Sequence, residues 1–184
     1  FPRHKYFIKN KSIFKYYNTG FKYTNDKRIL GIGINRPHFI EEFPYHKKFY
    51  DYMKSLEFED KLNNVLGLKE KKKLRCVNIV SSLADHGDFL PPHVDDVAED
   101  ATEFSINFIY FVDGSDENHE HSGATLINKD NNFNMLLLMP KSLKNTCLIY
   151  NGVSKDFYHG FKLMKKKAFR KAITFHFQQT ILNS

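Results

Sequence analysis

The chain has 184 residues, of which 41% are hydrophobic and 15% aromatic, a composition typical of one globular domain with a single core. Its formal net charge of +7 would suit a polyanion, but charge alone discriminates poorly, and we expect no nucleic-acid partner. The sequence contains neither a long uncharged apolar window nor a recognisable signal peptide, so we expect no membrane span and a cytoplasmic location. The oligomeric state is left open.

The N-terminal third of the sequence changes its pattern once. The first 40 residues are basic and aromatic with several turn signals, which predicts short strands or an extended arm. Between Tyr45 and Leu66, apolar residues recur at intervals of three and four, as they do on one face of a helix. Gly67 follows as a helix stop. The pattern predicts one or two amphipathic helices here.

From residue 76 onward the apolar pattern changes to alternation or to short continuous runs, separated by Gly and Pro. The predicted strands are 76–83, 104–112, 124–128, 134–140, 145–151 and 171–177. Helices followed by closely spaced strands indicate an α+β fold, a β-sandwich or jelly roll with the N-terminal helices packed on one outer face. We expect a single domain over 1–184, with an arm and supporting helices over 1–75 and a jelly-roll catalytic core over 76–178.

The stretch DFLPPHVDD, residues 88–96, places an imidazole and two carboxylates beside two prolines. His93 and Asp95 stand two residues apart, so in an extended segment both side chains lie on the same side and can reach one metal ion. Imidazole combined with carboxylate suits Fe(II) or Mn(II), and a second histidine would complete a triad that leaves three positions open. Taken alone, the motif is more often a polar turn, and Asp96 is an alternative to Asp95.

Two features downstream favour a metal site. His159 follows the predicted strand 145–151, and Arg170 opens the last strand. Alternation places one set of residues in that strand on one face and a second set on the other. The first set is Arg170, Ala172, Thr174 and His176; the second is Ile173, Phe175 and Phe177. A buried guanidinium needs a partner, and a bound carboxylate is a natural one because Arg can hold it with two parallel hydrogen bonds.

The order and spacing of HVD, SGATL, YHG and RKAIT are similar to those of a known family. From Cys76 to Phe177 the chain resembles the Fe(II)/2-oxoglutarate-dependent dioxygenases, and among them the prolyl-4-hydroxylase-like branch. The resemblance implies a double-stranded β-helix (jelly roll). It also implies Fe(II) as cofactor, with 2-oxoglutarate and O2 as co-substrates and ascorbate as a further cofactor that the branch allows.

The resemblance assigns roles to individual residues. It implies that His93, Asp95 and His159 are the Fe(II) ligands. It implies that Arg170 anchors the distal carboxylate of 2-oxoglutarate, with Thr174 beside it. Many relatives bind 2-oxoglutarate with a tyrosine on the strand before the HxD motif, and this chain has none there. The candidates to replace it are Asn78, Ser81, Ser82 and Asn107, and alternation places Asn107 on one face with Ser105.

The implied activity is hydroxylation of an unactivated C–H bond with release of succinate and CO2, on a protein or peptide side chain such as prolyl. Asp95 favours hydroxylation over halogenation, because halogenating relatives carry a small residue at the carboxylate position. The alternatives are the same chemistry on a small molecule, sugar or lipid, demethylation of nucleic acid, and a jelly-roll binding module without turnover. We interpret His119 and His121 as part of an acidic loop over the mouth of the barrel.

Overall fold

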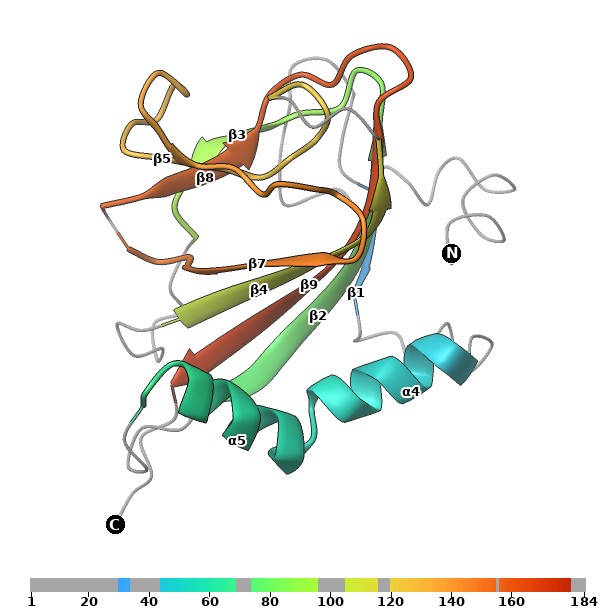
Figure 1. Cartoon of the computed structure of the whole chain (residues 1–184), viewed down its shortest axis with the longest axis vertical. Coiled ribbons are helices and arrows are strands. Elements are labelled where there is room, and N and C mark those ends of the chain that lie inside the picture. The colour runs from blue at the N-terminus through green and yellow to red at the C-terminus, as the bar shows by residue number, and fades with distance from the viewer. Residues whose placement is uncertain are drawn as a thin grey trace.

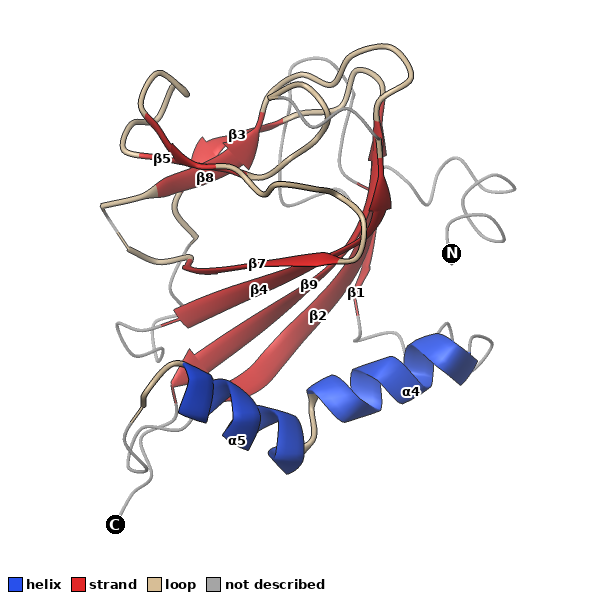
Figure 2. Cartoon of the chain, in the orientation of Figure 1, coloured by secondary structure: helices blue, strands red, loops and turns tan. Residues whose placement is uncertain are grey.

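The computed structural model describes residues 30–33, 44–68, 74–95, 105–115, 120–154 and 156–179. These residues form two antiparallel β-sheets and two helices, and the helices lie outside the larger sheet (Figures 1 and 2). The α+β jelly roll with helices on one outer face is therefore confirmed. The predicted arm over the first 40 residues lies outside the described residues, apart from strand β1 (Leu30–Gly33).

The larger sheet has five strands in the order β1-β2-β9-β4-β7. Besides β1 they are β2 (Leu74–Asp85), β9 (Phe169–Gln179), β4 (Ser105–Gly114) and β7 (Thr146–Asn151). The central strand β9 pairs along its length with β2 and β4. Its side chains alternate as predicted: Phe175 and Phe177 are buried among residues of the helices, whereas Ala172 is buried in the cluster between the sheets.

The smaller sheet has four strands in the order β3-β8-β5-β6. They are β3 (Leu90–His93), β8 (Tyr158–Phe161), β5 (Leu126–Asn128) and β6 (Leu136–Leu138). The sequence predicted neither β3 nor β8 as a strand. Both have only four residues, and β3 contains Pro91 and Pro92, which lack N–H donors. An edge strand tolerates such residues, and β3 is the edge strand of this sheet.

The predicted helical segment forms two helices, α4 (Pro44–Met53) and α5 (Leu56–Val65). The helix α5 begins after Ser55, whose Oγ accepts a hydrogen bond from the N–H of Phe58. Gly67 takes a φ of +65°, the left-handed conformation that glycine commonly supplies after a helix. The side chains that pack the helices on the larger sheet include Tyr50, Met53 and Leu62.

A separate apolar cluster fills the space between the two sheets. It includes Ile109 and Phe111 of β4, Leu148 of β7, Ala172 of β9, and Leu126 and Ile127 of β5. Because both sheets contribute, this cluster fixes their separation and with it the distance between side chains that reach across from either sheet.

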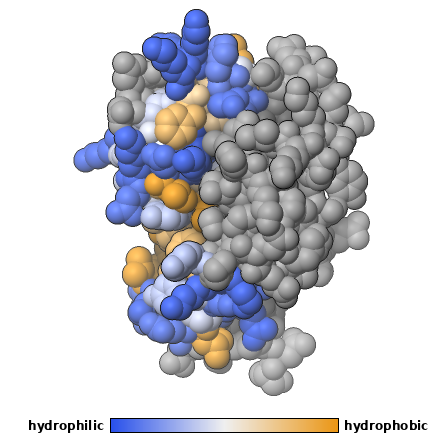
Figure 3. Space-filling view, turned by 90° about the vertical axis from the view of Figure 1, so that its right-hand side faces the viewer, coloured by the Kyte–Doolittle hydropathy of each residue, from blue (hydrophilic) through white to orange (hydrophobic). Residues whose placement is uncertain are grey.

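The described surface is mainly polar on the face that Figure 3 shows. In the side view of Figure 3, hydrophilic residues predominate on the coloured part of the surface, and hydrophobic residues appear between them in separate groups. None of the helices in the described part of the chain is long and apolar enough to cross a lipid bilayer.

Candidate metal centre

Two histidines from neighbouring strands lie side by side in the smaller sheet. His93 is the last residue of β3, His159 lies on β8, and the two are directly opposed in the antiparallel register. Directly opposed residues have their side chains on the same face of a sheet. Their ring centroids are accordingly 4.2 Å apart. The strand pairing therefore joins the two parts of the motif that lie far apart in the sequence.

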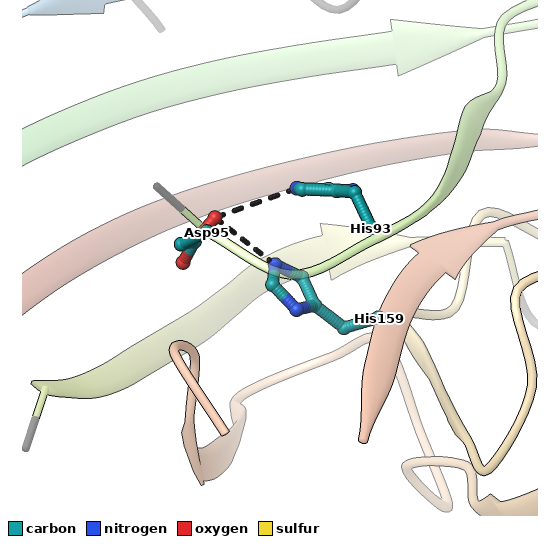
Figure 4. A group of neighbouring side chains, drawn as sticks. All are labelled: His93, Asp95 and His159. Atoms are coloured by element: carbon teal, nitrogen blue, oxygen red, sulfur yellow. Dashed lines mark ion pairs between the residues drawn. The ribbon is translucent and has the colours of Figure 1, made fainter. Parts of the chain in front are cut away.

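Asp95 completes the group, and its carboxylate faces both imidazoles (Figure 4). Its Oδ1 lies 3.4 Å from Nε2 of His93 and 3.3 Å from Nε2 of His159. Two ligand atoms about 2.1 Å from one metal ion and at right angles to each other are about 3.0 Å apart. Among the described residues, His93, Asp95 and His159 each offer one ligand atom, and these three atoms lie within 4.8 Å of one another. The spacing and the donor types fit a one-sided metal site with further positions open.

A backbone carbonyl fixes which ring nitrogen of His93 faces the group. Nδ1 of His93 lies 2.9 Å from the carbonyl oxygen of Pro91. A carbonyl oxygen can only accept, so Nδ1 carries a proton and Nε2 is the nitrogen that would bind a metal ion. Histidines that bind metals commonly donate their second ring N–H in this way. Pro91 thus holds the His93 ring through its carbonyl group.

The second carboxylate oxygen of Asp95 is held by the larger sheet. Nδ2 of Asn107 on β4 donates to Oδ2 of Asp95 at 2.5 Å, and the backbone N–H of Asp95 donates to the carbonyl of Gly152 at 2.9 Å. Burial alone would raise the pKa of Asp95. Hydrogen bonds with His159, His93 and Asn107 outweigh burial and hold this pKa well below its usual value. Asp95 is therefore ionised, as a metal ligand must be.

Two glycines allow the group to assemble. A Cβ atom at Gly152 would lie 2.5 Å from both Oδ2 of Asp95 and Nδ2 of Asn107. A Cβ atom at Gly160 on β8 would lie 2.5 Å from the carbonyl oxygen of Leu90 on β3. Real Cβ atoms do not approach other atoms so closely, so glycine is required at the carboxylate and at the strand pair that carries the histidines.

Arg170 of β9 reaches from the larger sheet to the segment that precedes β5. It is 4% exposed, and its Nη1 donates to the carbonyl of Gly123 at 3.0 Å and to Oγ1 of Thr125 at 3.1 Å. The guanidinium lies over the rings of Phe111 and Phe161, at 5.2 and 4.8 Å from their centroids. Its Nε has no hydrogen-bond partner, and no carboxylate of the described residues pairs with it. Burial lowers the pKa of Arg170 to about 10, which still leaves it charged at neutral pH.

Tyr150 of β7 lies beside the metal group, and the sequence did not indicate it. Its ring centroid is 4.8 Å from that of His159, and its hydroxyl accepts a hydrogen bond from Nδ2 of Asn107 at 3.2 Å. Burial and the negative charge of Asp95 raise the pKa of Tyr150, whereas the Asn107 hydrogen bond and the positive charge of Arg170 oppose them. The hydroxyl is therefore within electrostatic reach of both ends of the site.

The other predicted residues fall in several places. Thr174 is half-buried on β9, and its side chain makes no hydrogen bond with a described residue, so its predicted role stays a prediction. Asn107 lies against Asp95 and Tyr150, and its binding of 2-oxoglutarate also stays a prediction. Oγ of Ser82 is engaged with the backbone carbonyl of Ala172. Asp96, His119 and the side chains of Asn78 and Ser81 lie outside what the structure describes.

His121 lies apart from the metal group, whereas His176 lies near it. His121 is bound through Nδ1 to the carbonyl of Leu163 at 2.8 Å and is not a member of the metal group. His176 is half-buried and directly opposite Asn107 in the register, and burial lowers its pKa, while the charges of Asp95 and His159 also act on it. His176 thus lies opposite a residue that holds the Asp95 carboxylate.

Comparisons with known proteins support the fold. Neither a protein-family model nor a curated protein matches the chain. The structure of AviO1 from Streptomyces viridochromogenes Tue57 matches with a TM-score of 0.55 at 9% identity, over 91% of this chain and 79% of that chain.

Two further structures are similar at lower TM-scores. A prolyl-4-hydroxylase from Pseudomonas putida matches with a TM-score of 0.45 at 13% identity, over 64% of this chain. The matched part is 59% of the length of that hydroxylase. HygX from Streptomyces hygroscopicus, solved with nickel and 2-oxoglutarate bound, matches with a TM-score of 0.45 at 10% identity, over 82% of either chain. At 9% identity the likeness to AviO1 establishes the jelly-roll fold of this chain and nothing further.

Proposed function

We propose that this chain is an Fe(II)- and 2-oxoglutarate-dependent dioxygenase. The observation that carries the proposal is the presence of two incomplete binding sites within one jelly roll. One is the His93, Asp95 and His159 group with the spacing of metal ligands. The other is the buried guanidinium of Arg170, which has an unused N–H. A small 2-oxo acid with two carboxylates supplies what each lacks, a chelating end for a metal and a carboxylate for the arginine.

Each residue would contribute a definite part of the activity. His93, Asp95 and His159 would hold Fe(II) from one side and leave its other positions to ligands. When bound together, Fe(II), 2-oxoglutarate and O2 supply the oxidation of an unactivated C–H bond, with release of succinate and CO2. Arg170, whose guanidinium lies over the rings of Phe111 and Phe161, would bind the distal carboxylate. The exclusion of water by these rings strengthens a charge-assisted hydrogen bond.

For the substrate we propose a protein or peptide side chain such as prolyl. The support is the motif order that the chain shares with the prolyl-4-hydroxylase-like branch. A small molecule, sugar or lipid is the alternative, because it needs the same metal centre and differs only in what the surrounding loops accept. The ionised Asp95 supports hydroxylation rather than halogenation.

The test is a turnover assay with matched substrate classes. Protein supplied with Fe(II), 2-oxoglutarate and O2 should release succinate, and proline-containing peptides should stimulate the release more than sugars, lipids or oligonucleotides. Asp95→Ala should abolish the release. Asp113→Ala is the control, because Asp113 pairs with Lys171 outside the site and its loss should leave turnover intact. Succinate formation that survives Asp95→Ala would contradict the proposed centre.

A further inference from the structure

The hydroxyl group of Tyr150 accepts one hydrogen bond and donates none to a described residue. The residue lies on β7 directly opposite Asn107 on β4, and its hydroxyl oxygen accepts from Nδ2 of Asn107. A tyrosine hydroxyl can both accept and donate one hydrogen bond. Among the described residues, no acceptor takes the proton of this hydroxyl.

The charge of Asp95 explains why Asn107 donates to Tyr150 rather than accepting from it. A carboxylate only accepts, so the Asn107 amide must turn its nitrogen toward Oδ2 of Asp95. The same nitrogen then meets the Tyr150 hydroxyl, and Oδ1 of Asn107 is left buried without a partner. The reverse amide orientation would set two oxygen acceptors against each other. The direction of the hydrogen bond is thus imposed by the metal-ligand carboxylate.

The surroundings of Tyr150 indicate which acceptor its hydroxyl group can bind. The Tyr150 ring lies against His159, and its hydroxyl is under the influence of both Asp95 and Arg170. The ring also packs on the apolar cluster between the sheets, which includes Phe111, one of the two rings under the Arg170 guanidinium. Tyr150 therefore lies next to the place for a metal ion and on the cluster that carries the arginine. A donor in a partly buried position needs an acceptor, and an oxygen of a ligand that spans the two places would be one.

We propose that the Tyr150 hydroxyl donates its hydrogen bond to an oxygen of the dicarboxylate ligand held between the His93-Asp95-His159 group and Arg170, and that Asn107 directs it there. The inference rests on the proposed function and deepens it by adding a binding residue that neither the sequence motif nor the family resemblance assigns. Tyr150 would act on the ligand, and Asn107 would act through Asp95 and Tyr150 as a positioning residue.

Tyr150→Phe tests the inference, because it keeps the ring on His159 and removes only the hydroxyl. Binding should be measured by calorimetry in two steps, first Mn(II) alone and then 2-oxoglutarate in excess Mn(II) without O2. The variant should bind Mn(II) within about twofold of the wild type and 2-oxoglutarate about tenfold or more weakly, the usual effect of losing a hydrogen bond to a charged group.

Tyr110→Phe is the matched control. Tyr110 lies on β4, the strand that pairs with β7, and its hydroxyl donates to Oδ1 of Asn145 outside the site. This variant should bind both Mn(II) and 2-oxoglutarate like the wild type. Asn107→Leu offers an independent check: it removes both hydrogen bonds of the amide, so Mn(II) and 2-oxoglutarate should both bind more weakly.

The outcomes separate this inference from the proposed function. A wild type that binds 2-oxoglutarate, together with a Tyr150→Phe variant that binds it equally well, would overturn the role of Tyr150 and leave the proposed function standing. A wild type that binds Mn(II) but not 2-oxoglutarate would overturn both. Equal weakening of Mn(II) and 2-oxoglutarate binding in Tyr150→Phe would make Tyr150 a support of the metal group and would also contradict the inference.

Discussion

The two ends of the candidate site satisfy their polar groups to different degrees. At the metal end, Asp95 is held by Asn107 and both imidazoles, and Nδ1 of His93 is held by Pro91. At the other end, Arg170 has two acceptors for one nitrogen, aromatic rings on its faces and an Nε without a partner. The metal end is therefore preorganised by the protein, whereas the arginine end leaves an N–H that the proposed anionic ligand would satisfy.

This difference has an energetic consequence. A buried charge without a counter-charge is unfavourable, so Arg170 contributes less to stability than its contacts suggest. The hydrogen-bonded carboxylate at the metal end carries no such deficit. Substitutions at the metal end should therefore lower metal affinity, whereas substitutions at the arginine end should lower 2-oxoglutarate affinity with little loss of stability.

Arg170→Leu should give the largest difference between the loss of 2-oxoglutarate affinity and the loss of Mn(II) affinity. Affinity for 2-oxoglutarate in the presence of Mn(II) should fall on the order of a hundredfold, because the charge-assisted hydrogen bonds are lost. Affinity for Mn(II) alone should change less than about twofold. Because an apolar side chain replaces an uncompensated cation, the free energy of unfolding should fall by no more than about 1 kcal/mol. Calorimetry and chemical denaturation measure the three quantities.

Lys171→Leu is the control for the loss of charge. Lys171 is the next residue, and its ammonium pairs with Asp113 rather than with any residue of the site. The control should keep both affinities. If Arg170→Leu lost metal and 2-oxoglutarate affinity together, the two ends would not be separate.

Gly152→Ala should damage the metal end and spare the arginine. The new methyl group would collide with the Asp95 carboxylate and with the Asn107 amide, so the carboxylate must move. We expect Mn(II) affinity to fall about thirtyfold, within the range seen when the support of a metal ligand is lost.

Gly67→Ala is the control for Gly152→Ala, because Gly67 has open space around its Cβ position and a φ of +65°. It should cost about 1 kcal/mol of stability and leave metal affinity unchanged. Unchanged Mn(II) affinity in Gly152→Ala would show that Asp95 is not held as described.

Gly160→Ala should act on the histidines through the backbone. The added Cβ would meet the carbonyl oxygens of Leu90 and Pro91, so β3 must move away from β8 and carry His93 with it. We expect about a tenfold loss of Mn(II) affinity and a loss of about 1–3 kcal/mol of stability, typical of overpacking. Metal titration and thermal unfolding give both values, and a variant with wild-type metal affinity would contradict the role assigned to the strand pair.

Thr125→Val should have the smallest effect. It removes one of the two acceptors that orient Nη1 of Arg170 while keeping the shape of the side chain. We expect about a threefold loss of 2-oxoglutarate affinity, consistent with one neutral hydrogen bond, and no change for Mn(II). A gain in 2-oxoglutarate affinity would show that Thr125 competes with the ligand for the guanidinium.

The residues that the sequence did predict share a local signal. His93 and Asp95 stand in a two-residue spacing, and Arg170 is marked by alternation within one strand. The helices are marked by intervals of three and four. Such periodicities survive in a single sequence because they arise from the geometry of one element.

The sequence predicted His93 and His159 as ligands, but it did not reveal the contacts between elements that bring the residues of the site together. The opposition of His93 and His159 follows from the register of two four-residue strands, one of them with two prolines. Tyr150 and Gly152 belong to the site because β7 and the turn after it lie against β4 and Asp95. No spacing within one strand encodes such a contact, so a single sequence cannot reveal it.

The central claim is that one jelly roll holds Fe(II) and 2-oxoglutarate together, and it can be tested directly by anaerobic absorption spectroscopy. Wild-type protein with Fe(II) and 2-oxoglutarate should develop the weak visible charge-transfer band of the chelate. Asp95→Ala should show no band, and Arg170→Leu should require a far higher concentration of 2-oxoglutarate to reach it. A folded wild-type sample that binds Fe(II) but gives no band at saturating 2-oxoglutarate would contradict the claim.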